Sequence, residues 1–111
     1  MAITVFTQNP KILHAAIREA IDEKKIDTWA YDKDGDFYHT PDQWRGEAWL
    51  RPYEQQGMLT FGLVGCEGTQ MTKIVYGVYH GRFIEMLLTH FDTEFSNASA
   101  TALQDSVDLF K

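Results

Sequence analysis

The sequence predicts an α+β fold, a two-layer sandwich in which two or three helices cover a mostly antiparallel sheet of five or six strands. Apolar residues recur with helical spacing near both ends of the chain. The middle consists of short β-favouring segments separated by turn signals, which is typical of consecutive hairpins. Helices at both ends can cover one face of such a sheet. With 111 residues, we expect a single domain over residues 1–111.

The composition limits the partners and the compartment. The formal net charge is −6, and lysines and arginines do not cluster in the sequence, which argues against a nucleic-acid partner. No apolar run approaches the length of a membrane span, and the N-terminal segment lacks the features of a signal peptide. Cys66 is the one cysteine, which excludes an internal disulfide and fits a reducing compartment. We therefore expect a cytoplasmic protein without nucleic-acid or membrane partners.

The first two predicted elements are a strand and a helix. Residues 2–7 are rich in β-branched side chains and are apolar on both faces, which predicts an interior strand. Asn9 suits a helix N-cap and Pro10 suits the first helical position, so a helix is expected over residues 10–25. A crossover through this helix would allow one parallel strand pair. The apolar stripe of the helix comprises Ile12, Leu13, Ala16, Ile17, Ala20 and Ile21.

Residues 26–40 predict a hairpin centred on Asp34-Gly35. This dipeptide between β-favouring segments is typical of a type I′ turn, which needs positive φ at both central residues. Such a turn would place Lys33 opposite Asp36 and Tyr31 opposite Tyr38, and both cross-strand pairs are favourable.

The alternating aspartates of the same segment raise the question of a calcium loop. The helical calcium loop needs glycine at its sixth position and glutamate at its twelfth. Counted from Asp32, these positions hold Phe37 and Gln43. We therefore expect a turn and no metal, with a weak non-helical cation site as the alternative.

The next segments predict a short helical turn and three more strands. Thr40 and Pro41 suit a helix start that Gly46 would end, and residues 47–53 suit an edge strand because Pro52 cannot donate to a central ladder. Residues 57–66 and 71–80 then predict a second hairpin around residues 67–70. If Cys66 opposes Met71, the apolar face of this hairpin pairs Leu59 with Val78, Phe61 with Tyr76 and Leu63 with Ile74.

The C-terminal part predicts one or two helices. Residues 81–95 carry apolar side chains at helical spacing, with Arg82, Glu85, Thr89 and Asp92 on the solvent side. Residues 95–101 suit a linker. Residues 100–111 suit a last helix, for which Thr101 and Gln104 offer a capping box.

Residues 29–53 contain an unusual concentration of aromatic side chains. All three tryptophans lie there, and arginines are interleaved with them. Large aromatics with arginine are enriched in binding hot spots, whereas the simpler interpretation is that they pack one end of the core. The cluster comprises Trp29, Tyr31, Phe37, Tyr38, Trp44, Trp49 and Tyr53, with His39, Arg45 and Arg51 among them.

A second group of polar residues lies in "YHGRFIEM", where a strand is expected to meet a helix. His80, Arg82 and Glu85 stand near this junction, whose exposed backbone N–H groups would favour anions, but a polar helix start is the preferred explanation. The histidines lack the spacing of a helix-borne metal pair, and no segment has a phosphate-binding glycine pattern. No cofactor and no metal site are therefore expected.

Two hypotheses about function follow. The first is a small binding protein without catalysis, which presents the aromatic and arginine patch to a protein or peptide, with a second copy of the chain as one candidate partner through an edge strand. An acidic, immunity-like inhibitor of a basic toxin is one version of it. The second is a small enzyme or ligand carrier with a cleft near His39, Arg45, His80, Arg82 and Cys66. The candidate binding residues are Trp44, Arg45, Trp49, Arg51, Tyr53, His39, His80 and Arg82.

Overall fold

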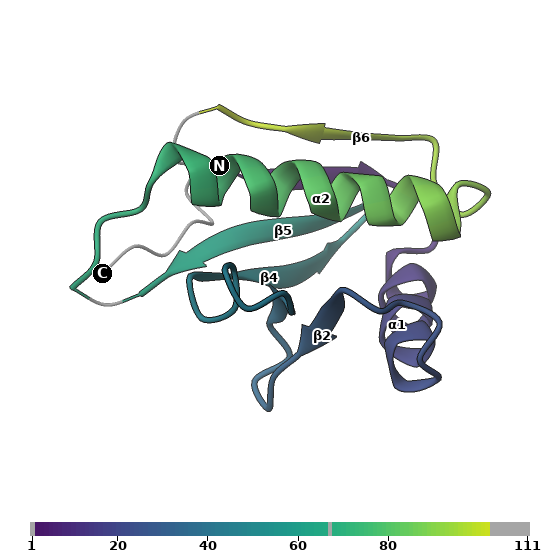
Figure 1. Cartoon of the computed structure of the whole chain (residues 1–111). Coiled ribbons are helices and arrows are strands. Elements are labelled where there is room, and N and C mark those ends of the chain that lie inside the picture. Colours follow the sequence, from purple (N-terminus) through teal and green to yellow (C-terminus); the bar gives the residue numbers. More distant parts are fainter. Residues whose placement is uncertain (1, 67, 103–111) are drawn as a thin grey trace.

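The computed structural model describes residues 2–66 and 68–102 and confirms the predicted α+β class (Figure 1). These residues form two helices and a six-stranded sheet in the spatial order β2-β3-β4-β5-β1-β6, in which every neighbouring pair is antiparallel. The elements along the chain are β1 (Ala2–Phe6), α1 (Pro10–Asp22), β2 (Trp29–Tyr31), β3 (Phe37–His39), β4 (Ala48–Gln55), β5 (Met58–Gly65), α2 (Lys73–Phe91) and β6 (Asn97–Ala100).

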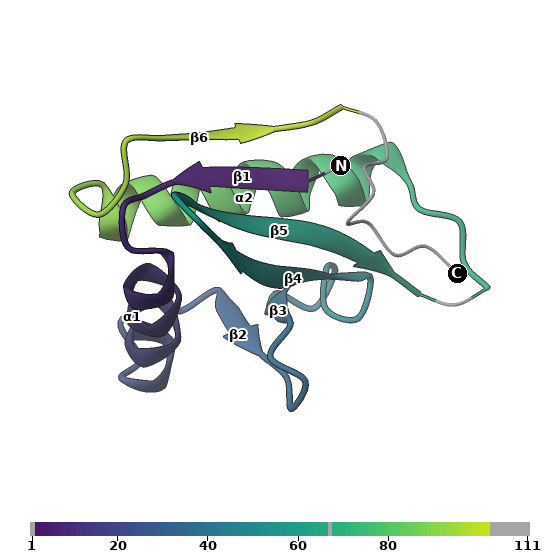
Figure 2. The same cartoon turned by 180° about the vertical axis from the view of Figure 1, so that it is seen from behind.

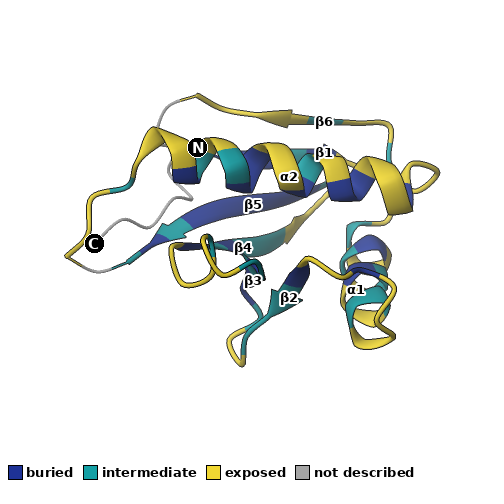
Figure 3. Cartoon of the chain, viewed as in Figure 1, coloured by how far each residue is buried: buried dark blue, intermediate teal, exposed yellow. Residues whose placement is uncertain are grey.

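Both helices contribute to one apolar core on one face of the sheet. Figure 2 shows the sheet in front of α2, and Figure 3 shows that β5 is buried along most of its length. At the centre, Phe83 of α2 packs against Phe61 at 4.7 Å and Trp29 at 4.9 Å between ring centroids. From α1, His14 meets the edge of Phe37, whose ring also contacts Phe83. Because both helices pack on this face, no helix among the described residues covers the opposite face of the sheet.

Tyr79 of α2 supplies the polar contact that joins this helix to the chain around β3. Its side chain is fully buried, its hydroxyl accepts the N–H of His39 at 3.2 Å, and it donates to the carbonyl of Trp44 at 2.9 Å. Burial raises the pKa of Tyr79 to about 12, so the hydroxyl keeps its proton at physiological pH.

We expect Tyr79→Phe to lower the free energy of unfolding by about 2 kcal/mol, because a buried backbone N–H and a partly buried carbonyl lose their partner. Urea denaturation followed by circular dichroism measures this change. Tyr76→Phe is the matched control, since the Tyr76 hydroxyl donates to the carbonyl of Thr101 in an exposed contact. Equal losses for the two variants would contradict the role assigned to Tyr79.

The N-terminal elements match the sequence prediction with two differences. β1 is an interior strand between β5 and β6, and α1 begins at Pro10, as expected. However, the side chain of Asn9 makes no capping hydrogen bond. The suggested parallel pair is wrong, because β1 is separated from β2 by β5, β4 and β3, and both of its own neighbours are antiparallel.

The first hairpin exists, but its turn is one residue longer than predicted. Tyr31 pairs with Phe37 rather than Tyr38, and Lys33 does not pair with Asp36. The N–H of Gly35 donates to the carbonyl of Asp32, and Gly35 alone in the loop has positive φ, at 85°. This is a three-residue loop that ends in a left-handed glycine, so the type I′ prediction is wrong.

The segment predicted as an edge strand lies inside the sheet, as β4. Pro52 is tolerated there because β3 is only three residues long and pairs with β4 around Leu50, so its ladder ends before Pro52. The preceding residues form turns rather than a regular helix, although the N–H of Arg45 reaches the carbonyl of Pro41 as in one helical turn.

The predicted second hairpin is wrong, because residues 73–80 are helical. α2 begins at Lys73, and the hydroxyl of Thr72 accepts the N–H of Val75 as its N-cap. The predicted face of Leu59, Phe61 and Leu63 is buried, but β5 pairs with β4 and β1 instead of residues 71–80. This segment is helical because it begins the apolar stripe of α2, whose residues are all buried. The stripe comprises Val75, Tyr79, Phe83, Leu87 and Phe91.

The helix predicted over residues 81–95 is confirmed over residues 81–91, which form the second half of α2 with Arg82, Glu85 and Thr89 exposed. The predictions for the residues that follow this helix are wrong where they can be compared. Residues 97–100 form β6 rather than a linker, and Thr101 lies outside any helix. The rest of the predicted last helix, residues 103–111, lies outside the described residues. Among residues 2–66 and 68–102, neither helix has the length and apolarity needed to cross a bilayer.

Candidate functional site

The structure places six of the eight candidate binding residues on two surfaces. Trp49, Arg51 and Tyr53 occupy alternate positions of β4 and are half-buried on the sheet face opposite the helices. In contrast, His39, Trp44 and Arg82 line a pocket on the helix side. The aromatic cluster is therefore partly core and partly surface, since Trp29 and Phe37 are buried whereas the tyrosines and the other two tryptophans are half-buried.

We call Tyr38, Trp49, Arg51 and Tyr53 the open-face patch. β3 and β4 are antiparallel with Phe37 opposite Leu50, so the same register places Tyr38 opposite Trp49. On the other side of β4, Trp49 pairs with Val64, and Arg51 pairs with Gly62, which adds no side chain. The patch is thus a broad aromatic surface with one arginine at its centre.

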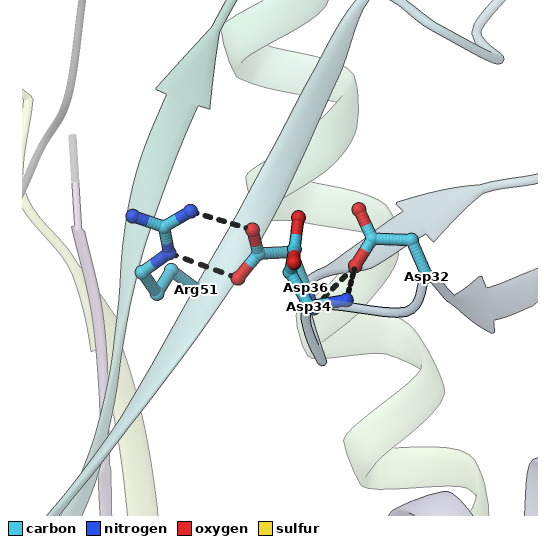
Figure 4. A network of polar contacts seen from close by, with 4 residues as sticks. All are labelled: Asp32, Asp34, Asp36 and Arg51. Carbon is cyan, nitrogen blue, oxygen red and sulfur yellow. Dashed lines mark hydrogen bonds and ion pairs between the residues drawn. The ribbon is translucent and has the colours of Figure 1, made fainter.

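Asp36 fixes the arginine of the open-face patch. Its two carboxylate oxygens accept hydrogen bonds from Nε of Arg51 at 3.0 Å and from Nη2 at 2.8 Å (Figure 4). The side chain of Asp36 is 5% exposed and that of Arg51 is 37% exposed. This bidentate ion pair therefore joins a buried anion to a partly hydrated cation. This contact with Asp36 raises the pKa of Arg51.

Two of the three aspartate carboxylates of the hairpin, those of Asp32 and Asp36, are engaged by the protein itself. Oδ1 of Asp32 accepts the backbone N–H groups of Asp34 and Asp36, each at 3.0 Å (Figure 4). These contacts and the Asp36–Arg51 pair show that the carboxylates of Asp32 and Asp36 accept hydrogen bonds within the protein and stabilise the turn. Within the described residues, no group of three or more histidine, cysteine, aspartate or glutamate side chains could hold a metal ion.

The second surface, which we call the His39 pocket, has a volume of about 510 Å³. This volume suits a small ligand. The pocket lies between the loop that follows α1, the turns before β4 and the exposed side of α2. Its lining residues are Lys25, Ile26, Asp27, Thr28, Trp29, His39, Pro41, Gln43, Trp44, Arg82, Glu85, Met86, Thr89 and His90.

His39 is the most constrained polar group of this pocket. The residue is 5% exposed, its ring lies 4.5 Å from that of Trp29, and Nδ1 is 2.7 Å from the carbonyl of Thr28. Because a carbonyl can only accept, Nδ1 carries the proton and Nε2 of the neutral ring is an acceptor. Burial lowers the pKa of His39, which favours this neutral form.

Three residues of the predicted polar cleft lie elsewhere. Arg45 donates from Nε to the carbonyl of Thr40 and lies over the ring of Tyr38, near the open-face patch. His80 is buried on α2, with Nδ1 at 2.8 Å from the carbonyl of Tyr76. The thiol of Cys66 donates to the carbonyl of Gly46. Of the five cleft residues, only His39 and Arg82 line the His39 pocket.

Sequence reasoning missed the pocket residues that come from the loop after α1. Asp27 and its neighbours carry no motif, and only the fold brings them beside α2. The contribution of α2 could have been found, because Arg82, Glu85, Met86 and Thr89 have the spacing of one helical face.

Comparisons of this chain with protein-family models, with curated proteins and with solved structures gave no match.

Proposed function

We propose that the protein is a small non-catalytic binding protein whose open-face patch docks on a protein or peptide partner. One observation supports this best: Trp49, Arg51 and Tyr53 are half-exposed side by side on a sheet face that no described helix covers. Aromatic side chains with arginine dominate binding hot spots because they bury large areas and lose little conformational freedom.

The ion pair with Asp36 makes this surface suitable for docking. Two of the donor groups of Arg51 are held by Asp36, so the guanidinium is oriented before a partner arrives and loses less entropy on binding. Its remaining donors can meet a carbonyl or carboxylate of the partner. The net charge of −6 favours association with a partner whose surrounding surface is basic.

Site-specific photocrosslinking in the source cells tests the proposal. A benzoylphenylalanine in place of Tyr53 is expected to crosslink a discrete polypeptide, whereas the same residue in place of Ile12, which is 62% exposed on α1, is not. The captured polypeptide is then purified and titrated calorimetrically, and Trp49→Ser is expected to weaken binding about tenfold or more. Ile12→Ser should leave the affinity unchanged.

The outcomes separate the partners. Crosslinks to a second copy of the chain, with dimers in sedimentation equilibrium that Trp49→Ser dissociates, would identify the partner as the protein itself. The proposal would be refuted by crosslinks of equal yield from positions 12 and 53, or by a partner whose affinity is unchanged by Trp49→Ser.

A further inference from the structure

We infer that the His39 pocket is a binding site for a small organic cation, an amine or amidine attached to an aromatic or alkyl group. This inference does not depend on the function proposed for the open-face patch, which lies on the other side of the sheet. It is based on the hydrogen-bonding state of His39, the charges of the pocket lining and its aromatic walls.

The first step concerns hydrogen bonding. The carbonyl of Thr28 fixes the proton on Nδ1, so His39 can offer only an acceptor, Nε2, to a molecule in the pocket. Because His39 is 5% exposed and its ring packs on Trp29, the imidazole cannot rotate, and Nε2 keeps its position. A ligand that complements it must donate a hydrogen bond.

The second step concerns charge. Two cations line the pocket, but both have an anionic partner: Nζ of Lys25 lies 2.9 Å from Glu23, and Nη1 of Arg82 lies 3.4 Å from Glu85. Asp27 also lines the pocket, and its carboxylate makes no ion pair with any described residue. Within the lining, Lys25 and Arg82 balance Asp27 and Glu85, and Glu23 beside Lys25 adds one further negative charge. The charge around the pocket is therefore negative, which favours a cation over an anion.

The third step concerns the walls. Trp29 and Trp44 line the pocket together with Met86 and Pro41. The half-buried indole of Trp44 can attract a cation or stack on a planar group. Trp29 contributes an apolar wall instead, because it is 2% exposed and its ring packs against other aromatic rings of the core. An ammonium that donates to Nε2 of His39 and to the Asp27 carboxylate, with its apolar part against these walls, uses every feature of the site at once.

The test uses tryptamine, with tryptophol as its neutral analogue and indole-3-propionate as its anionic analogue. In calorimetric titrations of the full chain, tryptamine is expected to bind at least about tenfold more tightly than either analogue, because only it adds a charge-assisted hydrogen bond. In NMR spectra, the indole N–H signals of Trp29 and Trp44 should shift, whereas that of Trp49, on the opposite face, should not.

Two carboxylate variants provide the matched comparison. Asp27→Asn is expected to weaken tryptamine binding about tenfold, whereas Asp42→Asn, an exposed position outside the pocket lining, should change it by less than about twofold. Equal effects of the two variants would show attraction by overall charge alone and would overturn the proposal. So would tighter binding of indole-3-propionate, a shift at Trp49 alone, or no saturable binding of tryptamine up to about 10 mM.

Discussion

Phe83→Ala is expected to lower the free energy of unfolding by about 4 kcal/mol, the largest effect of a single substitution that we predict. Phe83 is fully buried and contacts Trp29, Phe37 and Phe61, which come from three different strands. Removing its ring leaves a cavity at the point where α2 meets the sheet, and the aromatic contacts are lost in addition to buried area. Urea denaturation monitored by circular dichroism measures the change.

The matched control for Phe83→Ala is Leu88→Ala on the same helix. Leu88 is 55% exposed, so its removal should cost less than about 1 kcal/mol. A loss below about 2 kcal/mol for Phe83→Ala would contradict the central position of this ring in the core.

The second large effect is expected for Arg51→Met, which should lower the free energy of unfolding by about 3 kcal/mol. The side chain of Asp36 is 5% exposed and would lose both hydrogen bonds from the guanidinium, which leaves a buried charge without compensation. Since Arg51 itself is 37% exposed, water can reach part of the vacated space, and the value lies at the low end for a buried pair.

A double-mutant cycle with Asp36→Asn measures the pair itself. The double variant should be more stable than Arg51→Met alone, because the buried charge has then been removed together with its partner. Strict additivity of the two single changes would show that the ion pair does not couple these residues.

The sequence predicted those elements whose signals are local. β1 and α1 were found because β-branched residues, a proline at the first helical position and a continuous apolar stripe all lie within the elements themselves. The Asp-Gly dipeptide likewise located the first hairpin. It could not set the register, because the side chain of Asp32 holds two N–H groups of the loop and favours the longer turn.

The misassigned segment at residues 71–80 carried two periodicities at once. Ile74, Tyr76 and Val78 alternate as in a strand, whereas Val75 and Tyr79 begin the helical stripe that continues to Phe91. Tertiary packing decided between them, because the helix buries Tyr79 against Trp29 while Ile74 stays 69% exposed.

The candidate site was predicted only in part. Alternation along β4 was sufficient to place Trp49, Arg51 and Tyr53 on one face, but their position on an open sheet face depends on which face the helices cover. The His39 pocket depends on the contact between the loop after α1 and α2, which are far apart in the sequence. No local pattern encodes such a contact.

The position of β1 between β5 and β6 has a consequence for the order in which the chain can fold. Ile3 pairs with Ala100, which lies 97 positions further along the chain, so one side of β1 stays unpaired until the residues of β6 have left the ribosome. Beyond this ladder, Ala2 and Thr101 exchange hydrogen bonds, and the N–H of Ser96 donates to the carbonyl of Phe6. Closing so large a loop delays this pairing, and until β6 has docked, the edge of β1 is exposed and open to pairing with another chain.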